Sequence, residues 1–259
     1  MSDILAAEWL KLRSARATSV IIGVIGVFAV LMLAIAWSFV ATWEGLPPEG
    51  RAQSSMGSLP ELMGWIVSLI VAVFGALAIG SEFSSGMIRA TFVAMPARSR
   101  VLLAKAIVVA VTTFLLVEAA LVVTLLGSAA IVGDRPIAGQ TPLDDGDVVL
   151  VVAMGLTSVM FALIGLSLAA FTRSALASVV ALALIWYIAP LLAVRAPAPW
   201  NQLVSSLLPG ALAGQLAGTD NVNSVFAAVL SPVEALAILL LYCIGPLVLA
   251  RFVIVRTDL

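Results

Sequence analysis

Histidine is absent from the 259-residue sequence, and cysteine occurs only once, as Cys243. The first absence excludes a Ser-His-Asp triad and any histidine-ligated metal or haem. A lone cysteine forms neither an internal disulfide nor a CxxC site. The only lysines, Lys11 and Lys105, do not follow a glycine, so the phosphate-binding pattern GxxxxGKS/T is missing as well. We expect no metal, no cofactor and no ATPase site in this chain.

Charge is also scarce in this sequence. Charged residues make up 10% of it, whereas a soluble domain carries about 25%. Hydrophobic residues make up 63%, and the mean hydropathy is +1.19. No soluble core can bury so much apolar side chain. The composition therefore predicts an integral membrane protein that is surrounded by lipid, and we expect no nucleic acid among its partners.

Six stretches are long and apolar enough to cross a bilayer, which needs about 20 residues. The first is too long for the apolar region of a signal peptide, which has about 7–15 residues. We therefore predict an all-α membrane protein with a single transmembrane domain over residues 1–259. The predicted spans are residues 18–41, 62–81, 106–132, 148–171, 175–194 and 233–255.

The basic residues predict the orientation of these spans. Ten of the thirteen lysines and arginines fall on the side that holds the N-terminus. The other three, Arg51, Arg135 and Arg195, fall in the loops of the opposite side. By the positive-inside rule the N-terminal side is cytoplasmic. Because the number of spans is even, we predict a multi-pass protein of the cytoplasmic membrane with both termini inside.

The first 17 residues have the pattern of a helix. Leu5, Trp9 and Leu12 share one face, while Glu8 and Lys11 are polar. A tryptophan beside basic residues suits the headgroup region of a membrane. We expect an interfacial helix that either serves only as an anchor or also contacts a cytoplasmic partner.

The segment before span six, residues 195–224, is too apolar for an ordinary exposed loop. Gly210, Gly214 and Gly218 are spaced four residues apart, which would place them on one helix face and allow another backbone to approach closely. We expect a pair of short re-entrant or interfacial helices here. The alternative is a glycine-rich loop on the membrane surface.

Two spans begin with a capping signal. Ser58 precedes Glu61 and Ser231 precedes Glu234 by three residues, the spacing of a capping box in which serine and glutamate each satisfy a backbone N–H of the other. Pro232 falls at the first helical position, where its missing N–H costs nothing. These signals predict helix starts at spans two and six.

The segment between spans two and three, residues 82–105, is too long for a simple turn and too basic to enter the membrane. It carries Phe92, Val93 and Met95, apolar residues that a free loop would not need. A short helix that docks into a groove of another protein would use such side chains as anchors. The alternative is a helix that lies flat on the bilayer.

Two sequence motifs resemble one family. The run from Glu8 to Arg13 before span one is similar to the start of many ABC-2-type transporter permeases, and the segment from Glu82 to Lys105 resembles the first cytoplasmic loop of that family. Met87 departs from the family, in which threonine is common at this position. Six spans with both termini inside also agree with the family, so the resemblance covers the whole chain.

The resemblance implies a permease subunit without an ATPase of its own. Two permeases, either identical or related, and two ATP-binding-cassette ATPase subunits would form the transporter. The loop after span two would be the coupling helix, in which Phe92 and Met95 fill an apolar cleft of the ATPase and Arg89 and Arg98 meet acids at its rim. The hairpins before span six would form an outer gate. The implied ATPase-coupling residues are Glu82, Phe83, Gly86, Arg89, Phe92, Met95, Pro96 and Arg98.

One acidic residue, Glu118, falls near the middle of span three, where a charge costs roughly 2.5–3.5 kcal/mol. We expect it to be protonated, hydrogen-bonded to a neighbouring helix, or open to a wet path. Thr157, Ser158 and Tyr242 fall at a similar depth and are the predicted partners. Glu118 is thus either a neutral link between helices or part of the substrate path.

The leading interpretation is the membrane-spanning subunit of an ATP-driven exporter. The alternative is a proton-coupled secondary transporter in which Glu118 carries the proton. An intramembrane enzyme would need histidine, paired aspartates or a Cys-His pair, which the spans lack, so we expect no enzyme. A channel would need a ring of polar residues along a pore, and the spans offer few.

Overall fold

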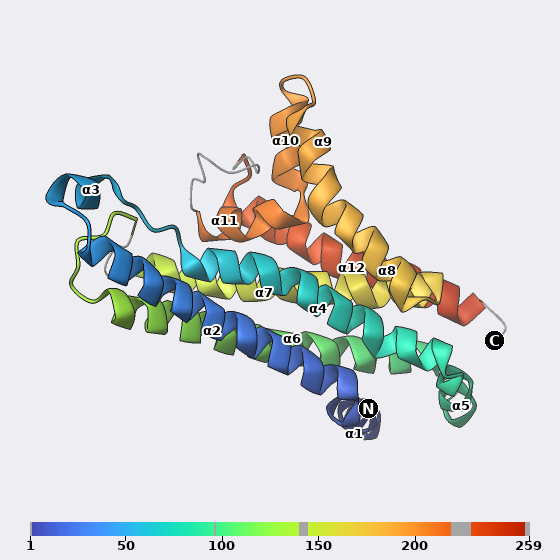
Figure 1. Ribbon diagram of the computed structural model, residues 1–259. Coiled ribbons are helices and arrows are strands. Elements are labelled where there is room, and N and C mark those ends of the chain that lie inside the picture. The colour runs from blue at the N-terminus through green and yellow to red at the C-terminus, as the bar shows by residue number, and fades with distance from the viewer. Residues whose placement is uncertain (1, 96, 140–144, 219–228, 257–259) are drawn as a thin grey trace.

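The computed structural model describes residues 2–95, 97–139, 145–218 and 229–256 (Figure 1). Of these described residues 87% are helical, and none of them forms a strand. A helix satisfies its own backbone N–H and C=O groups, which the bilayer cannot do. Six helical segments of the described ranges are long and apolar enough to cross a membrane. The predicted all-α membrane fold is confirmed.

The observed spans extend a few residues beyond most of the predicted ones. The fifth combines two α-helices joined by one turn of π-helix, Leu184–Ile188. The spans are α2 (Arg16–Glu44), α4 (Leu59–Ser84), α6 (Arg98–Val132), α7 (Asp145–Thr172), α8 with α9 (Ala175–Ala183 and Ala189–Val194) and α12 (Pro232–Arg256).

Helices α4 and α7 form the centre of the bundle and share its most extensive contact. Gly75 of α4 lies against the backbone of Ala162, and Gly165 of α7 lies against Ala72, so a Cβ at either glycine would overlap a carbonyl oxygen. Small residues of this kind let two membrane helices approach closely. Helices α2 and α6 cover one side of the central pair, and α8, α11 and α12 cover the other (Figure 1).

The two ends of the bundle carry different short elements. Helices α1 (Ser2–Ser14) and α5 (Met87–Ala94) lie at the same end as the C-terminal end of α12, while α3 (Pro48–Gln53) lies at the opposite end (Figure 1). Helix α3 was not predicted. The chain after it is fastened to the loop after α6, because the Met56 N–H donates to the Ala138 carbonyl at 3.0 Å.

The fifth span changes its helical geometry just before Pro190. Proline has no N–H and cannot continue the regular hydrogen-bond pattern, and the π-helical turn accommodates the interruption. The turn leaves Trp186 buried and the neighbouring Tyr187 exposed. Helix α12, in contrast, runs unbroken through Pro246.

The predicted pair of short helices before span six is present as α10 (Trp200–Leu207) and α11 (Leu212–Ala217). The buried side chain of Gln215 connects them, because its Nε2 donates to the Ser206 carbonyl at 2.8 Å. Its Oε1 accepts from the Leu230 N–H at 2.8 Å. One amide thus ties α10, α11 and the chain before α12 together, and α11 packs on α7 and α12.

The glycines of this segment do not form the predicted helix face. Gly210 lies in a 3₁₀ turn (Pro209–Ala211) between the two helices. Gly218 ends α11 in a left-handed conformation with φ of 68°, which glycine adopts without strain. Only Gly214 lies within α11. The even spacing therefore reflects a turn and a helix end, not a contact surface.

Both predicted helix starts are confirmed, but the two capping signals differ in detail. The Ser58 and Ser231 hydroxyls accept from the backbone N–H groups of Glu61 and Glu234, at 3.3 and 3.4 Å. The Glu234 carboxylate completes its box by accepting from the Ser231 N–H at 2.8 Å. The Glu61 carboxylate makes no corresponding bond in the described part of the chain.

We expect Gly75→Ala to destabilise the protein by about 1–3 kcal/mol, because the new methyl group would force α4 and α7 apart. Gly26→Ala in α2 is the matched control, since an added Cβ there meets no atom within 4 Å. Thermal unfolding of the purified proteins in one detergent measures the difference. Equal unfolding temperatures for the two variants would contradict the close contact.

Candidate functional site

Four charged side chains form a network at the end of the bundle that carries α1 and α5. Glu8 and Lys11 come from α1, Glu82 from the last turns of α4, and Lys105 from the first turns of α6. We call these four residues the charge cluster. Glu8, Glu82 and Lys105 are buried, and Lys11 is half-buried. The cluster joins three helices that are far apart in the sequence.

Each positive charge of the cluster lies between both negative charges. The Lys105 Nζ is 2.5 Å from Glu8 Oε2 and 2.8 Å from Glu82 Oε1. The Lys11 Nζ is 2.7 Å from Glu8 Oε1 and 3.2 Å from the same Glu82 oxygen. Two carboxylates and two ammonium groups balance to zero net charge. Such burial is tolerable only while every charge keeps its partners.

Lys11 shows how the cluster offsets the cost of burial. Burial lowers the pKa of its ammonium group, but the hydrogen bond to Glu8 and the negative charge of Glu82 raise that pKa by more, to above the ordinary 10.5. The stabilising contribution of Lys11 is therefore complete below pH 10.5 and is lost as the pH rises through its raised pKa.

Helix α5 rests directly on this cluster. Gly86 precedes it with φ of 71°, a left-handed conformation that reverses the chain after α4. The Lys11 Nζ also donates to the Thr91 hydroxyl at 3.4 Å. Ile88 and Phe92 pack into a hydrophobic core with residues of α4, α6, α7 and α12. Helix α5 is thus held by one hydrogen bond from Lys11 and by the apolar packing of Ile88 and Phe92.

The predicted anchors of α5 need correction. Phe92 is only 8% exposed and packs against its own chain, so its ring does not face outward, and Met95 is half-buried against the same core. The outward face instead presents Met87, Arg89 and Val93, of which Val93 is 83% exposed. The helical period separates these two faces, and the sequence alone did not show which face is covered.

Two further residues of the predicted coupling set, Phe83 and Arg98, pack against other parts of the same chain. Phe83 is half-buried against the same hydrophobic core as Phe92. The Arg98 guanidinium lies 5.3 Å from the centre of the Phe92 ring and donates to the Ile254 carbonyl of α12 at 3.2 Å. Arg98 therefore supports α5 from below. Pro96 lies outside the described residues.

Helix α1 has one polar and one apolar side chain facing inward. The buried residues are Glu8 and Leu12, whereas Trp9 and Leu10 are exposed. The polar Glu8 faces inward because Lys105 neutralises it there. Glu8 therefore belongs to the interior of the protein, and the exposed surface of α1 is partly apolar.

Glu118 of α6 lies against α7 at Gly155, where any Cβ would overlap the carboxyl group. Its Oε1 is buried and has no hydrogen-bond partner among the described residues. The partners predicted for it bond elsewhere. Thr157 donates to the Ala153 carbonyl at 2.8 Å, Ser158 lies 3.4 Å from Ser68, and Tyr242 donates to the Leu207 carbonyl at 3.1 Å.

The comparisons with known proteins agree with this arrangement. The sequence model of a family described as ABC-2 family transporter protein matches residues 4–190, from α1 into α9. The match includes the whole charge cluster and α5. No curated protein matches the chain. Because the match covers well over half of the sequence, the chain belongs to the ABC-2 family of transporter proteins and is a multi-pass membrane protein.

We expect Lys105→Met to destabilise the protein by about 3–5 kcal/mol, because it leaves Glu8 and Glu82 buried with only Lys11 between them. Thermal unfolding in detergent measures this loss. Adding Glu82→Gln to Lys105→Met removes the excess negative charge and should restore part of the stability.

The exposed pair at the opposite end of the bundle provides a control. Arg135 and Glu44 are 2.7 Å apart and both are exposed, so Arg135→Met should cost no more than about 1 kcal/mol. If Arg135→Met and Lys105→Met shift the unfolding temperature equally, burial does not set the strength of the cluster.

Proposed function

We propose that the chain is the membrane-spanning permease subunit of an ABC-2-type exporter, which moves a substrate across the cytoplasmic membrane with ATP hydrolysed by a separate ATP-binding-cassette subunit. Family membership supports the transporter class and favours it over a proton-coupled secondary transporter. The sequence carries no phosphate-binding loop of its own, so the proposal assigns ATP hydrolysis to the partner. The six spans act as one permease domain over residues 1–259.

The observation that best supports the proposal is that α5 is held firmly on one face and exposed on the other. The charge cluster and the hydrophobic core fix its inner face, while Met87, Arg89 and Val93 remain outside. A helix that is rigidly held and exposes apolar side chains around a basic one suits a groove in another protein. Force applied to α5 by the ATPase would pass through Glu82 and Lys105 into α4 and α6.

We also propose that the end with α1 and α5 is cytoplasmic, that both termini lie there, and that two permease copies, identical or related, form the transporter. The distribution of basic residues supports the orientation. The exposed Trp9 and Leu10 would place α1 against membrane lipid at the cytoplasmic surface. Helices α10 and α11, at the other end, would form the outer gate.

Docking of α5 can be tested with Val93→Asp. A charge at the centre of an apolar contact should weaken binding of the ATPase by about thirtyfold, because it would be buried without a partner. The fraction of ATPase recovered with the purified permease measures the effect. Val93→Thr, which keeps the shape of the side chain, is the matched control and should retain most of the partner.

Folding and docking are separable in this test. Phe92→Ala removes a buried ring and should lower the unfolding temperature, whereas Val93→Asp should not, since Val93 is exposed. Full ATPase recovery with Val93→Asp would refute docking through this face. Transport that continues without ATP but with an intact proton gradient would refute the exporter itself.

The orientation predicts which single cysteines react from outside intact cells. In a Cys243→Ala background, Gly50→Cys in α3 should be labelled by an impermeant maleimide, and Arg173→Cys in the turn between α7 and α8 should react only after the membrane is opened. Both positions lie outside the spans, so the reagent can reach each of them from one side. Labelling of position 173 in intact cells would reverse the topology.

A further inference from the structure

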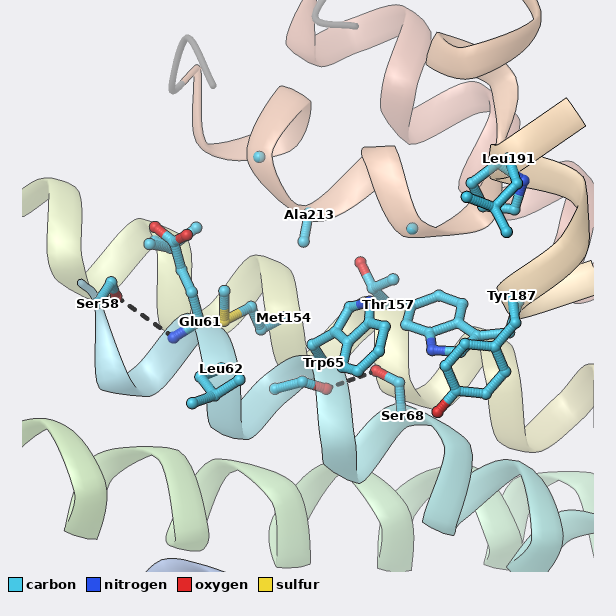
Figure 2. Close-up of a pocket in the computed structure, with 16 residues that line it drawn as sticks. Ser58, Glu61, Leu62, Trp65, Ser68, Met154, Thr157, Tyr187, Leu191 and Ala213 are labelled. Carbon is cyan, nitrogen blue, oxygen red and sulfur yellow. Dashed lines mark hydrogen bonds between the residues drawn. The ribbon is translucent and has the colours of Figure 1, made fainter. Parts of the chain in front are cut away.

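A cavity of about 630 Å³ lies between α4, α7, the π-helical turn of the fifth span and α11. It lies beside the first turns of α4, which begins at the end of the bundle opposite to α1 and α5 (Figure 1). Figure 2 shows Trp65, Met154 and Tyr187 along its walls and Ala213 of α11 above them. The volume falls within the range of about 300–1,000 Å³ that is typical of small-molecule sites.

Glu61 is the only charged residue among the described residues that line this cavity. Its backbone N–H is held by Ser58, but its carboxylate makes no hydrogen bond or ion pair in the described part of the chain. The corresponding Glu234 turns its carboxylate back to Ser231. In Figure 2 the carboxylate of Glu61 points away from α4 and toward the side of α11. The capping role predicted for Glu61 therefore leaves its negative charge free to act in the cavity.

Aromatic rings form the opposite part of the cavity wall. The Trp65 ring centre is 5.8 Å from that of Trp186 and 5.5 Å from that of Tyr187. Phe161 supports Trp186 from behind, edge to face, at 4.5 Å. The three lining rings come from α4 and from the π-helical turn, so the interruption before Pro190 positions two of them. Aromatic faces attract cations, and more strongly when water is excluded.

A second polar group in the wall has no partner. The Trp186 side chain is buried, and its Nε1 makes no hydrogen bond with the described residues. An indole N–H is a donor only, and a buried donor without an acceptor is costly. An oxygen or a ring face of a bound molecule would satisfy it. The wall thus offers a negative charge at one end, aromatic faces along its side and one unused donor.

We propose that this cavity binds lipophilic organic cations with an aromatic body, in which the positive charge lies near Glu61 and the rings stack against Trp65, Trp186 and Tyr187. The proposal rests on the function proposed above in one respect, since it makes such cations the substrate class of the exporter. Binding itself requires neither the ATPase nor transport. None of the described lining residues is basic, so an anion of the same size should bind more weakly.

Two ions of the same shape and opposite charge test the proposal on the unmodified full-length chain. Tetraphenylphosphonium and tetraphenylborate each carry four phenyl rings around one central atom and are nearly the same size, and they carry charges of opposite sign. Equilibrium dialysis against the purified protein in detergent, with empty micelles as the reference, measures the affinity of each. We expect the phosphonium to bind at least about tenfold more tightly. Equal affinities, or tighter binding of the borate, would overturn the proposal.

Variants then locate the bound cation. Glu61→Gln should weaken phosphonium binding about tenfold while keeping the helix start, because Ser58 bonds the backbone of residue 61 and not its side chain. Trp65→Ala should also weaken binding. Glu234→Gln, the matched glutamate outside the cavity, should leave the affinity unchanged. Phosphonium binding that survives Glu61→Gln, or that falls equally with Glu234→Gln, would refute the site.

The result is separable from the proposed function. If the phosphonium binds as expected but a complete transporter does not move it, the site stands and its role as the substrate site fails. If no ATPase partner exists, the binding measurement is unaffected because it contains none. Should Glu61→Gln fail to fold, the comparison of the two ions on the wild-type chain still decides the outcome.

Discussion

The close contact of α4 and α7 is the constraint on which the rest of the protein depends. Glycines at Gly75 and Gly165 bring the two backbones together without an intervening side chain, and the other spans pack around this pair. In lipid the hydrophobic effect does not drive helices together, so such close packing must supply much of the association. Both the charge cluster and the aromatic cavity lie where α4 meets other helices, at its last and first turns. The α4–α7 pair therefore holds the charge cluster and the aromatic cavity at a fixed separation.

Much of the fold could be predicted from the sequence because lipid restricts what a chain can do. Twenty apolar residues in a row have few alternatives to a spanning helix, so all six spans were found, and Ser58 and Ser231 marked two starts. The short polar elements between the spans were harder to predict from the sequence. Helix α3 has no apolar period from which it could be predicted. The glycine spacing at 210–218 predicted a helix face that the chain does not form. The tie made by Gln215 depends on backbone groups that meet only in the folded chain.

The candidate sites were predictable only in part. The resemblance drew attention to Glu8, Glu82 and Lys105, but charges bordering different spans do not reveal that they bind one another. Phe92 was predicted to face a partner, but its ring is buried. A short helix between two spans has two apolar sides, and packing alone decides which of them is covered. The aromatic cavity was not predicted for a similar reason, since Trp65 and Trp186 of its wall lie more than one hundred residues apart in the sequence. The capping pattern of Ser58 and Glu61 concerns the backbone N–H of Glu61 and does not determine where its carboxylate points.

The supports of α5 come from segments that emerge from the ribosome at widely separated times. Glu8 is made early, yet its partner Lys105 lies 97 residues later in the chain. Arg98, which holds the Phe92 ring, bonds to a carbonyl a further 156 residues on, near the end of α12. Closing loops of this length must follow the insertion of every span between them. The supports of α5 are thus complete only when α12 has docked. A chain in which α12 has not yet docked would hold α5 less firmly than the finished protein does.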